Sequence, residues 1–200
     1  MERFILIGLT CLLVNAAADA DEPSSTAYEL AETRLLAEWV GLVDEQYALA
    51  TAYYKGEHVQ RDYAEAFKWY HKAADQGHVI SQYRLGVMYD NGEGVPKDND
   101  KAITWYRKAA EQGHVSGQYK LGNKYARGKG VPQNYAEAYV WFNLSAASGH
   151  EEAAESRNRY ASELSRDVLA ESQRRSAQLF EEIQKRKAGL LKKTPLSPET

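Results

Sequence analysis

A repeat of 36 residues organises the chain. The segment at 78–113 recurs at 42–77 and at 114–149, with no insertion or deletion between the copies. The residues that keep the period in every copy are Gly77, Gly113 and Gly149, Trp69, Trp105 and Trp141, and Tyr53, Tyr89 and Tyr125. A fixed period of this length is typical of repeat architectures, in which a unit buries its apolar face only by stacking on its neighbours. The period therefore predicts the fold class before any local preference is considered.

Each repeat predicts two helices joined by a glycine-rich turn. In the central copy, apolar residues at helical spacing indicate a first helix over about 79–90 and a second over about 99–112. Two glycines and a proline in residues 92–96 break the chain between them. The flanking copies open the second helix at Asp62 and Asn134, each followed three residues later by Glu, which is a capping-box pattern. The whole pattern predicts an all-α stack of helix-turn-helix units.

These residues resemble the Sel1-like repeat, a relative of the tetratricopeptide repeat, in its exported bacterial form. The shared pattern is A-x-x-x-L-G-x-x-Y-x-x-G-x-G-V-x-x-(D/N)-x-x-x-A-x-x-W-x-x-x-A-A-x-x-G, and it covers residues 42–149. The first copy departs from it at His58 and Gln60, where the others have Gly and Pro. Because His tolerates positive φ better than most residues, that turn is expected to survive but to be looser. The resemblance implies a right-handed α/α solenoid used for protein–protein contacts, with no single reaction attached to it.

The segments outside the repeats predict a leader and two helical caps. Residues 1–20 have an apolar run at 4–14 followed by alanine-rich cleavage signals, which indicate a signal peptide and a periplasmic or secreted protein; an uncleaved membrane anchor is the alternative. After cleavage no integral membrane segment is expected. The expected divisions are 1–20 signal peptide, 21–41 linker and N-terminal capping helix, 42–149 three repeats, 150–187 C-terminal capping helices, and 188–200 a basic tail expected to be disordered.

Composition and motifs argue against several function classes. The formal net charge of −3 does not indicate nucleic-acid binding. The single cysteine, Cys11, lies in the leader, so the mature chain lacks the disulfides of the cysteine-rich Sel1-like proteins that have been linked to β-lactam chemistry. His78, His114 and His150 recur with the period, but equivalent positions lie about 10 Å apart in packed helices and cannot share a metal ion. We expect them to start helices. No catalytic, metal or cofactor site is predicted, and the chain is interpreted as a non-enzyme.

The candidate partner-binding surface lies on the first helices, on the side away from Leu85. At 100° per residue, positions 83, 87 and 90 point about 140–200° from Leu85. The equivalent residues of the three repeats are Tyr47, Thr51 and Tyr54, then Tyr83, Val87 and Asp90, then Tyr119, Asn123 and Ala126. Basic side chains at its edges are Arg84, Lys120 and Lys124. We call this surface the first-helix face.

Two interpretations of its tyrosines remain. Tyr47, Tyr83 and Tyr119 recur in every repeat, so they serve either a ligand or the packing of neighbouring first helices. Tyr54, Val87, Asp90 and Asn123 vary between repeats, which packing alone does not require. The predicted function is an exported, non-catalytic scaffold that binds an unidentified protein or peptide bearing acidic groups, in extended or helical form. A ligand- or glycan-binding envelope module with tyrosine stacking faces is the alternative.

Overall fold

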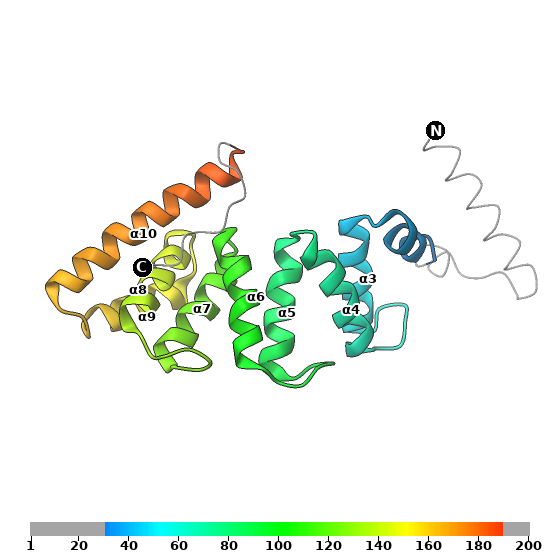
Figure 1. Ribbon diagram of the computed structural model, residues 1–200, viewed down its shortest axis with the longest axis horizontal. Helices are drawn as coiled ribbons and strands as arrows, with labels where there is room; N and C mark the ends of the chain where they lie inside the picture. Colours follow the sequence, from blue (N-terminus) through cyan, green and yellow to red (C-terminus); the bar gives the residue numbers. More distant parts are fainter. Residues whose placement is uncertain (1–30, 190–200) are drawn as a thin grey trace, which may run out of the picture.

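The computed structural model describes residues 31–189, and all regular secondary structure in that range is helical (Figure 1). Helical residues 31–35 lead into a π-helical turn, and paired helices follow. The elements are η1 (Leu36–Val40), α3 (Val43–Lys55), α4 (Tyr63–Asp75), α5 (Val79–Asn91), α6 (Asn99–Glu111), α7 (Val115–Arg127), α8 (Tyr135–Ala147), α9 (Glu151–Ala161) and α10 (Arg166–Lys187). Three hairpins, α3–α4, α5–α6 and α7–α8, stand side by side in chain order along the long axis (Figure 1). The predicted right-handed α/α solenoid with helical C-terminal caps is confirmed.

Capping side chains explain where the helices begin. Asp62 accepts hydrogen bonds from the backbone amides of Ala64 and Glu65 at 2.9 and 3.0 Å, and Asn134 accepts one from Glu137 at 3.0 Å. His78 and His114, at the N-caps of α5 and α7, accept through Nδ1 from amides three residues later, at 3.2 and 3.1 Å. The prediction that these histidines start helices is therefore confirmed. His150 is the N-cap of α9 but makes no side-chain cap hydrogen bond.

Each repeat's tryptophan packs against its neighbour. Trp69, Trp105 and Trp141 are 4, 7 and 4% exposed. Trp105 belongs to an apolar cluster built mainly from the first repeat, and Trp141 to one that includes Ala102 and Ile103 of the second. No repeat thus completes its own core, which is why a single hairpin of this sequence would not be stable.

The second glycine of the turn is required because backbones approach closely there. Gly94 has φ +71°, and a Cβ on it would lie 2.3 Å from the carbonyl oxygen of Tyr63 in the preceding repeat. A Cβ on Gly130 would lie 2.8 Å from the Cβ of Asn99. At the same place in the first repeat, His58 adopts φ +62° and is exposed. The expectation that this turn survives with a side chain at the second glycine position is confirmed.

Hydrogen bonds from glutamine side chains connect the repeats. Gln76 and Gln112 each donate to the Oε1 of the glutamine in the first helix of the same repeat, at 2.8 Å, and to the carbonyl oxygen of Gly41 or Gly77, at 3.3 Å. In the third repeat Ser148 replaces the glutamine. There the Nζ of Lys187, from α10, donates to the equivalent carbonyl of Gly113 at 3.3 Å. The last helix therefore supplies a hydrogen bond that the third repeat lacks.

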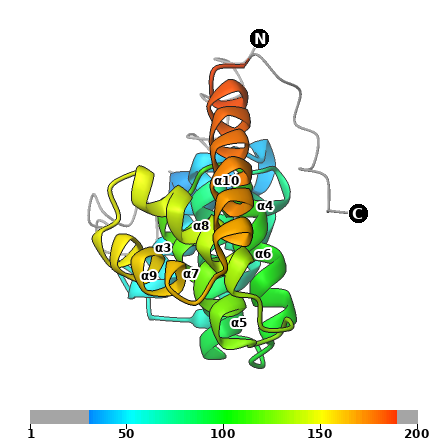
Figure 2. The same ribbon diagram turned by 90° about the vertical axis from the view of Figure 1, so that its left-hand side faces the viewer.

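Helix α10 crosses the second-helix side of the last repeat (Figures 1 and 2). Leu179 packs on the cluster that contains Trp141 and Leu144, and Ile183 is 2% exposed beside Gly113. In the first two repeats, the position of Leu144 is a lysine whose Nζ lies 3.8 or 3.9 Å from the centre of the repeat's tryptophan ring. The second helix thus has an apolar residue at this position where α10 covers it, and a lysine where α10 does not.

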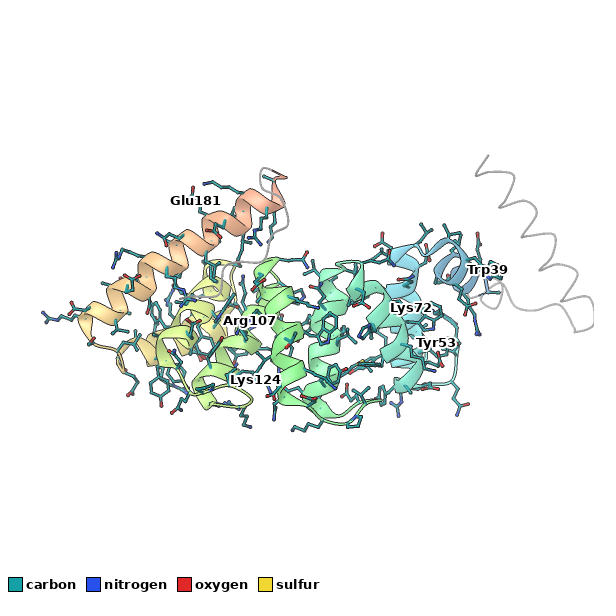
Figure 3. All side chains as sticks on the ribbon, viewed as in Figure 1. Trp39, Tyr53, Lys72, Arg107, Lys124 and Glu181 are labelled. Atoms are coloured by element: carbon teal, nitrogen blue, oxygen red, sulfur yellow. The ribbon has the colours of Figure 1, made fainter. Side chains whose placement is uncertain are left out.

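The two ends of the described chain carry exposed apolar side chains. Trp39 is 78% exposed and lies at the N-terminal end of the stack (Figure 3). Phe180 and Val168 of α10 are 36 and 41% exposed, while Ser172 and Ser176 are buried. Within residues 31–189, no helix combines the length and apolar character needed to cross a bilayer. The predicted signal peptide, most of the linker and most of the basic tail lie outside the described residues.

Candidate functional site

The invariant tyrosines of the first-helix face pack between repeats. Their ring centroids lie 4.4–4.7 Å from the imidazole centroid at the start of the next first helix. The pairs are Tyr47 with His78, Tyr83 with His114, and Tyr119 with His150. The second of the two interpretations, packing between first helices, is the one that matches these contacts. Sequence reasoning did not pair the two residue types, although both recur with the same period and lie 31 residues apart.

Tyr54 also forms contacts between repeats. Its hydroxyl donates to Oε2 of Glu93, in the turn of the second repeat, at 2.9 Å. Burial, followed by the hydrogen bond and charge of Glu93, raises the pKa of Tyr54 to about 12, so the phenol remains a donor at neutral pH. The Arg84 guanidinium lies 5.8 Å from the centroid of the same ring. Tyr54 therefore joins the first two repeats.

Asp90 and Lys124 bind each other. The Nζ of Lys124 lies 2.5 Å from Oδ1 of Asp90 and donates to Oδ1 of Asn99 at 2.8 Å. The Lys124 side chain is only 6% exposed and lies among the helices in the middle of the stack (Figure 3). The sequence analysis placed Lys124 at a basic edge of the face, and this prediction is wrong. At 100° per residue Lys124 lies only about 60° from Leu121, on the buried side of the helix. The equivalent residue of the second repeat, Met88, is fully buried.

Val87 and Asn123 lie half-buried on the face at equivalent positions. Val87 packs against the second apolar cluster. Asn123 donates from Nδ2 to the carbonyl oxygen of Tyr119 in its own helix, at 3.1 Å, so its Oδ1 remains an acceptor. These two residues provide one apolar and one polar contact in the middle of the face.

Arg84 and Lys120 are the charges that the face leaves uncompensated. They occupy equivalent positions in α5 and α7, and both are half-buried. The Arg84 Nε is fully buried without a hydrogen-bond partner. Among residues 31–189, neither side chain has a carboxylate within ion-pair distance. A buried donor without a partner costs roughly 1–3 kcal/mol, more when it is charged, so this pair is suited to an anionic ligand.

The histidine caps make the stability of the stack depend on pH. Burial, then the positive charges of Arg84 and Lys187, lowers the pKa of His114 below its ordinary value of 6.5, and burial lowers the pKa of His78. A histidine whose pKa is lower in the folded than in the unfolded protein contributes fully to stability at pH values above its unfolded pKa. This contribution decreases as the pH falls from the unfolded pKa to the folded pKa. We expect the melting temperature to fall between pH 7.5 and 5.5.

The His114→Asn variant tests whether the histidine caps cause this pH dependence. Asparagine caps helices but does not titrate, so the fall over this range should become smaller. His58→Asn, at an exposed histidine, should leave the fall unchanged. Thermal melts at half-unit steps of pH measure both, and an unaltered pH profile in His114→Asn would contradict the assignment.

No three His, Cys, Asp or Glu side chains in the described part of the chain are grouped to hold a metal ion. The first-helix face carries two cations, several phenols and an amide. The fold defines a helical-repeat protein, a class in which stacked helix pairs present extended surfaces.

The chain belongs to the Sel1 repeat family. Residues 46–78, 79–114 and 115–150 each match the Sel1 repeat, which together is more than half of the chain. Proteins of this family are generally non-enzymatic scaffolds for protein–protein interaction.

Solved structures agree with this assignment. A Sel1 repeat protein from Oxalobacter formigenes is 34% identical, with a TM-score of 0.61 over 66% of this chain and 98% of that one. A protective antigen of uropathogenic Escherichia coli displaying an SLR fold is 28% identical over 93% of this chain, with a TM-score of 0.59. The chain spans 48% of that antigen. Helicobacter pylori cysteine rich protein B is 26% identical over 62% of this chain and 95% of that one, with a TM-score of 0.50. No curated protein matches the chain.

Proposed function

We propose that the chain is an exported, non-catalytic scaffold that holds a segment of a protein partner on the first-helix face. The observation that carries the proposal is the pair of uncompensated cations, Arg84 and Lys120, at equivalent positions of adjacent repeats. Repeat solenoids use such extended surfaces for binding, and charge complementarity provides much of their specificity. The glycan alternative is weaker because the rings of Tyr83 and Tyr119 already stack on histidines.

Charge reversal tests the binding surface. The tagged Arg84→Glu/Lys120→Glu variant should no longer capture the partner from an envelope extract. The matched control is Lys97→Glu/Lys129→Glu, which makes the same change in net charge at exposed turn residues of the same repeats. Melting curves of both variants should remain close to that of the parent chain. Capture that survives in the first variant, or is lost equally in both, would place the binding surface elsewhere.

Export is the second part of the proposal, and the N-terminal sequence supports it. The apolar run at 4–14 is short for a bilayer span and is followed by alanine-rich cleavage signals. The mature protein should begin at Asp19 or Asp21 and partition with the periplasmic or secreted fraction. Edman sequencing of the purified protein measures this, and an intact leader on soluble cytoplasmic protein would refute it.

A further inference from the structure

We propose that the N-terminal end of the solenoid binds the C-terminal tail of a second copy of this chain, so that chains associate head to tail. The binding surface, which we call the end surface, consists of the exposed apolar residues Trp39, Val40 and Leu42 and the carboxylates beside them. Its occupant is the segment 190–193 of the other chain, Leu-Leu-Lys-Lys, which lies outside the described residues. The inference is independent of the first-helix face and of its acidic partner.

The two ends of the stack differ in what they expose. Terminal units of a solenoid need a polar outer face for solubility. At the N-terminal end, Trp39, Val40 and Leu42 are nevertheless 78, 57 and 43% exposed. Exposed apolar residues rimmed by charged ones are typical of an interaction surface. The exposed residues of α9, near the other end, are all charged or polar: Glu151, Glu152, Glu155, Asn158 and Arg159.

The charges of the end surface are complementary to those of the tail. Residues 31–45 contain four carboxylates and one cation, Arg34, which pairs with Glu38 at 3.3 Å. Negative charge is therefore in excess there. Residues 185–193 contain five cations and no carboxylate. In residues 190–193 two leucines directly precede two lysines, so one short segment can contact both the apolar residues and the carboxylates.

The position of α10 requires that the tail comes from another chain. Lys187 donates to the carbonyl oxygen of Gly113 at 3.3 Å, which holds the end of α10 beside α6 and α7 (Figure 1). Helices α4 and α5 lie between that point and η1 along the stack (Figure 1). The two leucines follow Gly189 directly, and two extended residues span at most about 7 Å. The tail of the same chain thus cannot place them on Trp39.

The contact is heterologous, because the end surface and the tail are different parts of the chain. A dimer formed in this way leaves one end surface and one tail free, so that further copies can add. An isologous dimer, in which two end surfaces meet, would instead bring the excess carboxylates of both copies together, which is unfavourable.

Complementation between two variants tests the head-to-tail contact. A chain truncated after Gly189 keeps the end surface, whereas full-length Trp39→Ala/Leu42→Ser keeps the tail. Serine suits position 42, which is the N-cap of α3. In sedimentation velocity, the weight-average mass of the mature parent chain should rise with concentration. Each variant alone should remain monomeric, and an equimolar mixture should form a dimer of one chain of each and nothing larger.

The other outcomes of this experiment contradict the proposal. Association that persists in the truncated chain would overturn it in favour of an isologous dimer. A parent chain that stays monomeric, or a mixture of the variants that does not dimerise, would also overturn it. Lys192→Ser/Lys193→Ser should weaken association, and the matched control Lys97→Ser/Lys129→Ser, which removes the same charge from exposed turns, should not.

A tail peptide measures the contact directly. A fluorescein-labelled peptide of residues 188–196 is titrated with the truncated chain and followed by anisotropy. Replacing both of its leucines by serine, or both of its lysines by glutamate, should raise the Kd at least about 5-fold. In the truncated chain, Glu38→Lys/Asp44→Lys should reverse the preference and bind the glutamate peptide more tightly than the lysine peptide. Equal Kd values for all peptides, or no reversal in a variant with unchanged helical circular dichroism, would refute the assignment.

Discussion

Replacement of Trp105 by alanine is expected to lower the free energy of unfolding by about 3–5 kcal/mol, the range for truncation of large aromatic residues in cores. Trp105 is 7% exposed, and its cluster joins the first repeat to the second. The variant therefore opens a cavity at an interface between repeats, where a solenoid draws most of its stability. Urea unfolding followed by circular dichroism measures the loss.

Trp39→Ala is the matched control for this prediction. The same side chain is removed, but Trp39 is 78% exposed, and exposed substitutions usually change stability by less than about 0.5 kcal/mol. If Trp105→Ala unfolded at the same urea concentration as the parent chain, the coupling of the repeats through their tryptophans would be wrong.

Replacement of Lys124 by methionine, with Asp90 retained, is expected to cost about 2–4 kcal/mol. Removing one member of a buried ion pair leaves the other charge uncompensated in a poorly solvated site. The Asp90 side chain is 24% exposed, which places the loss below that of a fully buried pair. The first interface between repeats supplies a neutral precedent, because Met88 stands at the position of Lys124 and is fully buried.

A second substitution should restore much of this loss. In Lys124→Met/Asp90→Asn no charge remains, and the amide can still accept from the hydroxyl of Tyr106, which donates to Asp90 at 3.4 Å. Lys120→Met, on the same helix but without an ion pair, should change stability by less than about 0.5 kcal/mol. Equal stability of Lys124→Met and Lys120→Met would show that the ion pair contributes nothing.

The helices were predictable because their signals are local and repeated three times. The helix expected over about 79–90 is Val79–Asn91, and the one expected over about 99–112 is Asn99–Glu111. A capping oxygen, a terminating glycine and an apolar stripe act within one or two turns of the backbone, so sequence spacing describes them well. Repetition then removes the ambiguity that one copy alone would leave.

The candidate site was predictable only in part. The sequence placed Arg84 and Lys120 at equivalent positions of adjacent repeats, and both side chains are half-buried. A helical wheel could not show that Lys124 binds Asp90, that Tyr54 donates to Glu93, or that Tyr83 and Tyr119 stack on histidines. These partners come from a neighbouring repeat, so a single-helix projection does not contain them.

The sequence by itself determined the period, the helix ends and the buried tryptophans, since each follows from hydrogen bonding and apolar spacing within one repeat and its copies. Only the tertiary structure decided which polar side chains are consumed at the interfaces between repeats and which remain free. Lys187 shows the difference most clearly, because it lies 74 residues from Gly113 and yet donates to its carbonyl oxygen. Such contacts depend on distances of a few ångströms between stacked helices, whereas spacing along the chain encodes only which faces meet.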